Sequence, residues 1–326
     1  MLSYLLYPLK TPLSSYYQAL PNSLQKFFRY AIILIMNADF SLHNCTICPV
    51  SCKADRIKTT GKCGVNGIRI AKYYLHPFEE PCISHKNGSG TIFFSGCNLR
   101  CPFCQNYEVS RATRGKAIDE YALKDIFQEL EDKGADNISL VTPTHIVPYL
   151  IKAFNLYKPK IPVVYNTGGY EKVETLRLID DYIDIYLPDL KFYSPALSKR
   201  YLGREDYFDY AEKAVEFMSK KPLTLTDDGK MLSGLIVRHL VMPLCSSDSK
   251  KIVEWYAEHI GDKGYLSLMR QYTPFGKIEN YPELSRKITS REYNAVAERA
   301  LELGVDKLFT QEKSSAETEY IPDWDF

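Results

Sequence analysis

Short apolar runs alternate with longer amphipathic segments over most of the chain, from about residue 88 onward. In residues 119–133, for example, Leu123, Ile126 and Leu130 fall on one face at helical spacing. This alternation predicts a parallel sheet built from right-handed βαβ units, open or curled into a full or partial barrel. The expected strands are residues 91–95, 137–142, 162–166, 184–187, 235–242, 265–272 and 307–311, and the expected helices are 119–133, 146–157, 172–180, 207–219, 248–259 and 290–303.

Polar residues gather directly after the predicted strands. Because ligands of parallel sheets bind at the carboxyl ends of the strands, these positions are the first place to look for function. They comprise residues 96–106, 142–145, 166–169, 188–191, 242–243 and 270–274. The sequence therefore predicts one functional edge of the sheet.

Composition and charge narrow the class of protein. The 326 residues are 45% hydrophobic and 25% charged, which is typical of a globular protein and excludes a fibre or a disordered chain. The net charge of +1 argues against a protein that grips a nucleic-acid backbone, so we predict no nucleic-acid partner. The best apolar run, residues 30–36, is far shorter than the ~20 residues of a membrane span, so we predict no membrane association.

The nine cysteines are bunched along the chain. All lie between residues 45 and 104 except Cys245. Close spacing without a secretion signal indicates metal binding in a reducing compartment, so we predict a cytoplasmic protein. Cys245 follows an apolar stretch and is interpreted as a small buried hydrophobe.

Three cysteines with the spacing C-x3-C-x2-C follow the first predicted strand. In such a loop, Cys97, Cys101 and Cys104 can place three thiolates around one cuboidal iron–sulfur cluster. One iron then stays open to a small-molecule ligand, which marks a reactive centre rather than a structural one. The alternative is a zinc knuckle completed by a fourth residue, but no clear fourth ligand follows immediately downstream.

The loop at residues 95–106, Ser-Gly-Cys-Asn-Leu-Arg-Cys-Pro-Phe-Cys-Gln-Asn, resembles the cluster loop of the radical S-adenosylmethionine superfamily. With its flanks, it is similar to uncharacterised homologues of pyruvate formate-lyase activating enzyme, and the resemblance runs from about Cys45 to the C-terminus. It implies an α/β fold, a partial (β/α)6 radical-SAM barrel over residues 88–312, with a [4Fe–4S] cluster on the three cysteines. In this family S-adenosyl-L-methionine chelates the open iron and is cleaved reductively to a 5′-deoxyadenosyl radical, which abstracts a hydrogen atom.

The resemblance also implies a set of cofactor contacts. Asp189-Leu190-Lys191 is similar to the Asp-x-Lys element of glycyl-radical activating enzymes, in which the lysine faces the methionine carboxylate; a surface salt bridge is the alternative. Asn166-Thr167-Gly168 resembles the turn after the third strand in those enzymes, and a plain tight turn is the alternative. The other expected cofactor contacts are Phe103, Gln105, Asn106, Arg238 and Gln271, the last two only if strand phase points them into the barrel.

Two positions depart from the family pattern. Many members carry Gly-Gly-Glu after the second strand to bind the methionine amino group, where this chain has Thr-Pro-Thr-His at residues 142–145. The activating enzymes carry a histidine late in the pocket, where this chain has Thr273 and Pro274. Both departures count against an activating enzyme in the strict sense. We interpret His145 as a structural residue at the start of a helix, with a contact near the substrate as the alternative.

A second group of cysteines precedes the core. It lies in a short polar segment that is too small to have its own core, and four thiolates can complete a metal site that folds such a segment. We predict a small N-terminal cysteine-rich module over residues 41–87, which binds zinc or a second iron–sulfur cluster; unligated thiols are the alternative. The expected ligands are Cys45, Cys48, Cys52 and Cys63, with Cys82 outside the spacing and interpreted as buried, and with Glu79 and Glu80 at the rim or in solvent.

The two ends of the chain are assigned no chemistry. Residues 1–40 are predicted to be an N-terminal extension, either upstream of a true start at Met36 or an amphipathic helix docked on the body. Residues 313–326 are a polar C-terminal tail.

The resemblance predicts a radical SAM oxidoreductase similar to glycyl-radical activating enzymes and anaerobic in habit. The expected partners are a flavodoxin or ferredoxin reductant and a glycyl-radical enzyme or peptide substrate. One alternative is a radical reaction on another peptide or a small molecule. The other is a non-catalytic iron–sulfur electron-transfer protein, whose clusters would be fully ligated; a purely structural zinc protein would contain no iron.

Overall fold

The computed structural model describes residues 42–312, which belong to one compact unit that begins at Leu42. The predicted N-terminal extension, with its start at Met36 or its docked helix, and the predicted tail at 313–326 lie outside these residues. Within the described range, no helix combines the length and the apolar character that crossing a bilayer requires.

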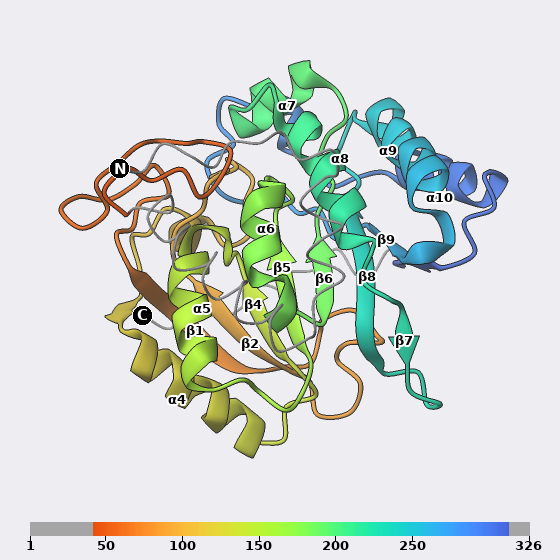
Figure 1. Cartoon of the computed structure of the whole chain (residues 1–326). Helices are drawn as coiled ribbons and strands as arrows, with labels where there is room; N and C mark the ends of the chain where they lie inside the picture. The colour runs from red at the N-terminus through yellow and green to blue at the C-terminus, as the bar shows by residue number, and fades with distance from the viewer. Residues whose placement is uncertain (1–41, 313–326) are drawn as a thin grey trace, which may run out of the picture. The chain divides into compact units, whose positions relative to one another are not determined.

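Parallel strands form most of the sheet (Figure 1). Their order is β2-β4-β5-β6-β8-β9-β10, and each pair of neighbours is parallel. All seven were predicted from the apolar runs, and the predicted α/β fold is confirmed. The full sheet starts at β10 and ends at β3 without closing, as in a partial barrel. The parallel strands are β2 (Ser89–Phe94), β4 (Ile138–Val141), β5 (Val163–Thr167), β6 (Ile185–Pro188), β8 (Met231–Leu240), β9 (Tyr265–Met269) and β10 (Leu308–Thr310).

Three further strands were not predicted. β1 (Ile68–His76) runs antiparallel between β2 and β3 (Lys116–Ile118), and β7 (Thr224–Leu225) pairs with β8. Only Ile68 and Ile70 of β1 are buried, so its pattern of apolar residues is weak. The structure thus places β1 in the barrel sheet, within the segment 41–87 that we predicted as a cysteine-rich module.

Helices follow the parallel strands, and α4, α5, α6 and α8 lie side by side over one face of the sheet (Figure 1). Local signals explain two boundaries: the Asp119 side chain caps α4, and Thr289 and Glu292 form a capping box on α10. The six predicted helices are confirmed as α4 (Glu120–Asp132), α5 (Val147–Leu156), α6 (Val173–Ile179), α8 (Tyr207–Met218), α9 (Ser246–His259) and α10 (Ser290–Glu302). The structure adds α3 (Tyr107–Ser110), α7 (Pro195–Leu202) and the 3₁₀ turns η1 (Thr144–Ile146), η2 (Asp180–Tyr182), η3 (Gly261–Lys263) and η4 (Pro282–Leu284).

The two faces of the sheet pack against different partners. Val163 and Tyr165 of β5 belong to the large core shared with the helices. Val164, between them, belongs to a smaller cluster on the opposite face, together with Cys82 and Ile83 from the loop between β1 and β2. This loop therefore fills part of the concave side, and the functional pocket lies beside it.

Candidate functional site

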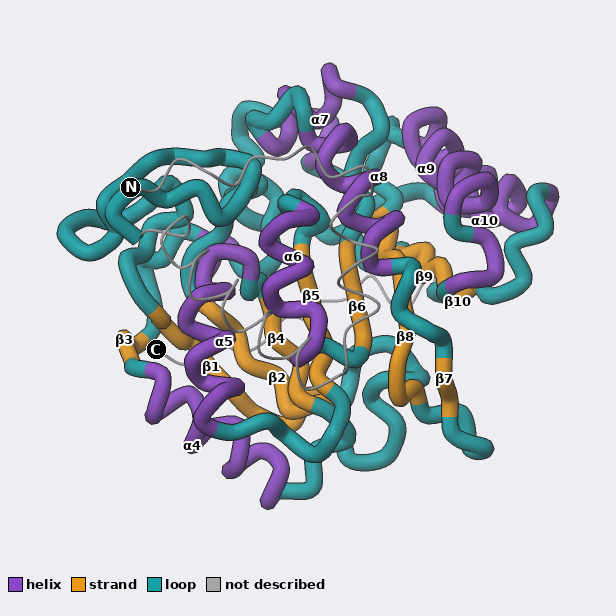
Figure 2. The backbone as a smooth tube through the Cα atoms, in the orientation of Figure 1, coloured by secondary structure: helices purple, strands orange, loops and turns teal. Residues whose placement is uncertain are grey.

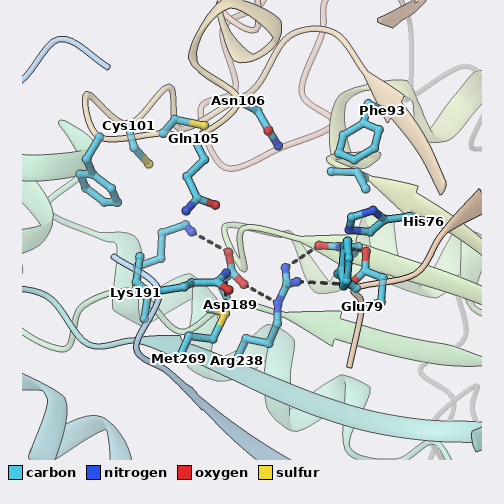
Figure 3. Close-up of a pocket in the computed structure, with 17 residues that line it drawn as sticks. His76, Glu79, Phe93, Cys101, Gln105, Asn106, Asp189, Lys191, Arg238 and Met269 are labelled. Atoms are coloured by element: carbon cyan, nitrogen blue, oxygen red, sulfur yellow. Dashed lines mark hydrogen bonds and ion pairs between the residues drawn. The ribbon is translucent and has the colours of Figure 1, made fainter. Parts of the chain in front are cut away.

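One pocket combines the predicted cluster loop with the ends of the parallel strands (Figure 3). Its walls come from strands β1, β2, β4, β5, β8 and β9 and from the segments that follow β1, β2, β6 and β9. It is therefore at the predicted functional edge. The lining residues are His76, Phe78, Glu79, Phe93, Cys101, Phe103, Cys104, Gln105, Asn106, Val141, Asn166, Asp189, Lys191, Arg238, Leu240, Met269 and Gln271.

The cluster loop brings its three cysteines together beside this pocket. Cys101 is buried, and Cys97 and Cys104 are half-buried. Burial raises the pKa of the Cys101 thiol to about 12, and burial and the charge of Cys97 raise the pKa of Cys104. Because metal coordination requires thiolates, loading the site would release protons from these groups.

Neighbouring segments hold the cluster loop in place. The backbone N–H of Lys277 donates to the Pro102 carbonyl at 3.0 Å, and the N–H of Cys97 donates to the Cys63 carbonyl at 3.2 Å. Gly96 has φ +91°, and a Cβ there would lie 2.7 Å from the Cys63 carbonyl oxygen. The glycine is therefore required by a close backbone approach.

The donor set fits the cluster that the sequence implies. In residues 42–312, no three His, Cys, Asp or Glu side chains converge on a position for a single metal ion. A cuboidal cluster does not require the thiolates to converge on one point, because each thiolate binds a separate iron. Three thiols on one loop, with the cation of Lys191 acting on Cys101, supply soft ligands and a positive charge for an anionic cluster.

Asp189, Lys191 and Arg238 form a charged network inside the pocket (Figure 3). Lys191 Nζ lies 2.6 Å from Asp189 Oδ2, and Arg238 Nε lies 2.9 Å from Asp189 Oδ1. Burial opposes ionisation of Asp189, but the two cations hold its carboxyl pKa below the usual value. Asp189 in turn raises the pKa of Lys191 against the effect of burial. The Asp-x-Lys pair is thus a pocket ion pair and not the surface salt bridge we considered.

Arg238 also orders the next part of the pocket. Its Nη2 donates to Asn166 Oδ1 at 2.6 Å, and its Nη1 lies 3.7 Å from Glu79 Oε2. Asn166 Nδ2 donates to Glu79 Oε1 at 3.3 Å. The strand phase of Arg238, which the sequence left open, is therefore inward.

The glycines after Asn166 permit tight packing of chain segments. A Cβ on Gly168 would lie 2.9 Å from the Leu99 Cδ1 of the cluster loop. Gly169 has φ +81°, and a Cβ there would run into the Asp189 carbonyl. The turn is thus more than a plain tight turn, because it seats the cluster loop and the Asp189 segment against each other.

Three side chains of the pocket come from β1, its following loop and β2; His76 and Phe93 were not predicted there, and Glu79 was expected either at the rim or in solvent. Figure 3 shows His76, Glu79 and Phe93 on the side of the pocket away from Cys101. Glu80 lies nearby, accepts from Ser267 Oγ at 3.0 Å, and has its pKa raised to about 7 by burial. Glu79 and Glu80 are therefore internal and not solvated, which a charged pair in sequence does not reveal.

The remaining predicted residues divide between pocket and core. Phe103, Gln105, Asn106 and Gln271 line the pocket. His145 does not: it is 2% exposed, its Nε2 is 2.9 Å from the Ser95 carbonyl oxygen, and burial and Arg56 lower its pKa to about 3. Its structural interpretation is confirmed. Cys82 and Cys245 are buried free thiols, as expected.

The two departures from the family pattern also lie outside the pocket lining. Thr144 donates to Glu171 Oε1 at 2.5 Å, and neither Thr273 nor Pro274 contributes to the lining. Burial raises the pKa of Glu171 to about 7. Residues 142–145 are thus part of a buried polar network behind the pocket.

Residues 91–228 match the model of the Radical SAM superfamily. This segment, which contains the three-cysteine loop, is similar to the domain that the model describes. The match indicates an enzyme with a [4Fe–4S] cluster that binds S-adenosylmethionine.

Known proteins and solved structures are similar to this chain over half of its length or more. An uncharacterized protein of Methanocaldococcus jannaschii is 28% identical over 275 residues, which are 82% of this chain and 77% of that protein. Streptococcus suis SuiB bound to precursor peptide SuiA has 16% identity and a TM-score of 0.45, over 66% of this chain and 46% of SuiB. The chain thus spans less than half of the SuiB length. A domain of pyruvate-formate lyase-activating enzyme from Bacteroides vulgatus has 12% identity and a TM-score of 0.37, over 52% of this chain and 91% of that domain.

Proposed function

We propose that the chain cleaves S-adenosylmethionine reductively and abstracts a hydrogen atom from a glycine of a protein or peptide, as glycyl-radical activating enzymes do. The cluster would be held by Cys97, Cys101 and Cys104, and flavodoxin or ferredoxin would supply the electron. The observation that carries the proposal is that Cys101, Cys104 and the Asp189–Lys191 pair line one pocket.

The charged network complements the amino-acid part of the cofactor. Its carboxylate can accept a hydrogen bond from Lys191, and its ammonium group can donate to Asp189, so that the ligand inserts into the existing ion pair. Arg238 keeps Asp189 ionised and oriented during this exchange, because it bonds the other carboxylate oxygen. Asp189 thereby does what the absent Gly-Gly-Glu element does in other members. When bound, the cluster and S-adenosylmethionine would supply a 5′-deoxyadenosyl radical.

The side of the pocket away from Cys101 is where we place the substrate. Phe93 offers an apolar surface there, while His76 and Glu79 offer polar contacts (Figure 3). A peptide backbone needs both, and burial of the reacting atoms keeps water from the radical. Glu79 is already bonded to Asn166, so its position is set before a substrate arrives.

The test is anaerobic reconstitution with iron and sulfide, followed by dithionite and S-adenosylmethionine. Chromatography measures 5′-deoxyadenosine from the wild type, from Cys97→Ala and from the control Cys245→Ala, which changes a buried cysteine outside the pocket. We expect product from the wild type and the control only. A formed, reducible cluster that binds no S-adenosylmethionine would contradict the proposal.

A second measurement addresses the substrate. Proteins and peptides labelled with deuterated glycine are added to the reaction, and mass spectrometry follows deuterium in 5′-deoxyadenosine. Deuterium transfer is the expected result. Transfer only from substrates labelled at other residues would contradict glycine as the target and leave the radical chemistry in place.

A further inference from the structure

The four N-terminal cysteines lie in a segment without regular structure. No helix or strand is assigned between residues 42 and 67 (Figure 2), yet Cys45, Cys48 and Cys63 are buried. A segment of this size buries little apolar surface of its own, so a cross-link of some kind is the usual way to order it. All four thiols are free of disulfides.

The sulfurs of this segment are gathered in one place. A Cβ built on Gly61 would lie 3.2 Å from the Cys63 Sγ and 3.6 Å from the Cys52 Sγ, so both sulfurs flank the same point. The N–H of Lys53 donates to the Cys45 carbonyl at 2.9 Å and the N–H of Ser51 donates to the Cys48 carbonyl at 3.0 Å, so the residues on either side of Cys52 bind the backbone of the other two cysteines. The sulfurs do not yet surround a single-ion position, so they would draw together as a metal binds.

Arg56 supplies the second, independent observation. It is 1% exposed, its Nη1 donates to the His145 carbonyl at 2.6 Å, and the same atom is 4.0 Å from the Cys45 Sγ. Its Nε and Nη2 are buried without a hydrogen-bond partner among the described residues. A buried guanidinium is costly unless an anion faces it, and neutral thiols do not provide one.

We propose that Cys45, Cys48, Cys52 and Cys63 bind a thiophilic metal centre, zinc or an iron–sulfur cluster, whose negative charge is balanced by the buried Arg56. Four thiols lose their protons as the metal binds, and a tetrathiolate centre then carries net negative charge. The unpartnered Nε and Nη2 belong to the same guanidinium whose Nη1 lies 4.0 Å from the Cys45 Sγ. The positive charge of Arg56 and the negative charge of the metal-bound thiolates thus offset each other, which lowers the free-energy cost of burying both.

The centre would also brace the catalytic loop. The carbonyl of Cys63 accepts the hydrogen bond from the N–H of Cys97, the first cysteine of the cluster loop. Arg56 bonds the carbonyl of His145, whose ring contacts the Ser95 carbonyl just before that loop. This bracing role rests on the proposed function, whereas the metal site itself does not.

Three further bonds fix the segment to the barrel. Lys172 Nζ donates to the Thr46 carbonyl at 2.9 Å and to Ser51 Oγ at 2.7 Å, and Thr175 Oγ1 donates to the Ile47 carbonyl at 2.5 Å. Both Thr46 and Ile47 lie between two of the proposed ligands. Movement of those ligands is therefore transmitted to α6 and to the loop after β2.

The test is metal analysis of the full chain, purified anaerobically, with the variant Cys97→Ala/Cys101→Ala/Cys104→Ala, which removes the cluster of the proposed function. We expect this variant to retain about one zinc, or about four irons with labile sulfide, per chain. Adding Cys52→Ala and Cys63→Ala to this variant should lower its metal content per chain at least tenfold. Adding Cys82→Ala instead should leave the metal content unchanged. Zinc and iron both support the site, and their ratio identifies the metal.

Two results would overturn the proposal: no metal in the cluster-loop variant with its structure intact by circular dichroism, or equal metal after Cys52→Ala and Cys63→Ala. A disulfide among these cysteines in the anaerobic protein would do the same. Because no activity is measured, failure of the radical chemistry leaves this result unaffected.

Arg56 is tested through metal retention. Arg56→Met should raise the metal's dissociation constant roughly tenfold or more in a chelator competition, and Arg56→Lys should recover part of the loss. A second experiment asks which part of the chain depends on the metal. The wild type is treated with chelator and then digested with protease. Cleavage should then begin within residues 42–67 and stop when metal is restored. Unchanged retention in Arg56→Met would contradict the charge-balancing role.

Discussion

The two groups of cysteines present the same ligand atoms in opposite surroundings. Cys101 and Cys104 line a pocket that also holds the Asp189–Lys191 pair, so a ligand can reach them. The N-terminal cysteines lie outside that lining and close to Arg56, whose Nε and Nη2 have no hydrogen-bond partner among the described residues. An open, three-thiolate site is suited to reaction, and a closed, four-thiolate site is suited to structure or electron storage.

The surroundings of the cysteines, more than their spacing, separate the two proposed roles. Near the cluster loop, the Asp189–Lys191 ion pair lines the pocket, where both groups can bind an amino acid. Near the N-terminal set, a fixed cation faces the sulfurs and is held by the His145 carbonyl.

The largest difference is expected between cysteine variants of the two groups. Cys104→Ala should reduce 5′-deoxyadenosine formation by at least about a hundredfold, because it removes a ligand of the reacting cluster. Cys52→Ala should leave measurable product, with a loss of roughly tenfold or less, because it acts only through the bracing of the Cys97 loop. Product and iron content are measured together. Equal losses in both variants would remove the distinction between the groups.

The ion pair is probed next. Lys191→Met should weaken S-adenosylmethionine binding by roughly 10- to 100-fold, in line with about 1.5–3 kcal/mol for a hydrogen bond to a charged group. Lys221→Met is the matched control, since Lys221 pairs with Asp180 at 3.1 Å and is absent from the pocket lining. Isothermal titration with the reconstituted protein gives both constants. Equal affinities in the two variants would show that Lys191 does not meet the ligand.

Packing behind the pocket can be changed without touching a charge. Gly169→Ala should lower the free energy of unfolding by about 3 kcal/mol, since the methyl group meets the Asp189 carbonyl and the residue has φ +81°. Gly203→Ala should cost only about 1 kcal/mol, because Gly203 has φ +65° but open space around it. Denaturant titration compares them. The account of the turn fails if the two glycines tolerate alanine equally well.

The smallest effect is expected at Glu171, which accepts hydrogen bonds from Thr144 and Thr167. Burial raises the pKa of Glu171 from its usual 4.5 to about 7, so between these two pH values the native state holds a proton that the unfolded state releases. The free energy of unfolding should therefore fall as pH rises from 4.5 to 7, by on the order of 2 kcal/mol. Glu171→Gln removes this contribution, so its stability should vary less over the same range. Chemical denaturation at several pH values provides the comparison, and parallel curves would refute the assignment.

Much of the fold was predictable from sequence because its signals are local. Apolar runs predict β4 and β5, and amphipathic spacing predicts α4, since each of these elements packs against the core. β1 escaped prediction because most of its residues are half-buried. The three-cysteine spacing identified the cluster loop, because all of its ligands come from one short segment.

The other parts of the site depend on contacts between distant segments. The inward direction of Arg238 follows from its strand phase, and the burial of Glu79 depends on Arg238 and Asn166. Arg56 reads as an ordinary charged residue until the structure places it against the His145 carbonyl, 89 residues away in sequence. Sequence patterns do not encode such pairings.

The most direct test of the central claim is electron paramagnetic resonance of the reconstituted, dithionite-reduced protein before and after addition of S-adenosylmethionine. If one iron of the Cys97–Cys101–Cys104 cluster is open, the ligand should bind it and change the spectrum, and Cys97→Ala should abolish the change. A reduced cluster whose spectrum stays the same at saturating S-adenosylmethionine would contradict the account.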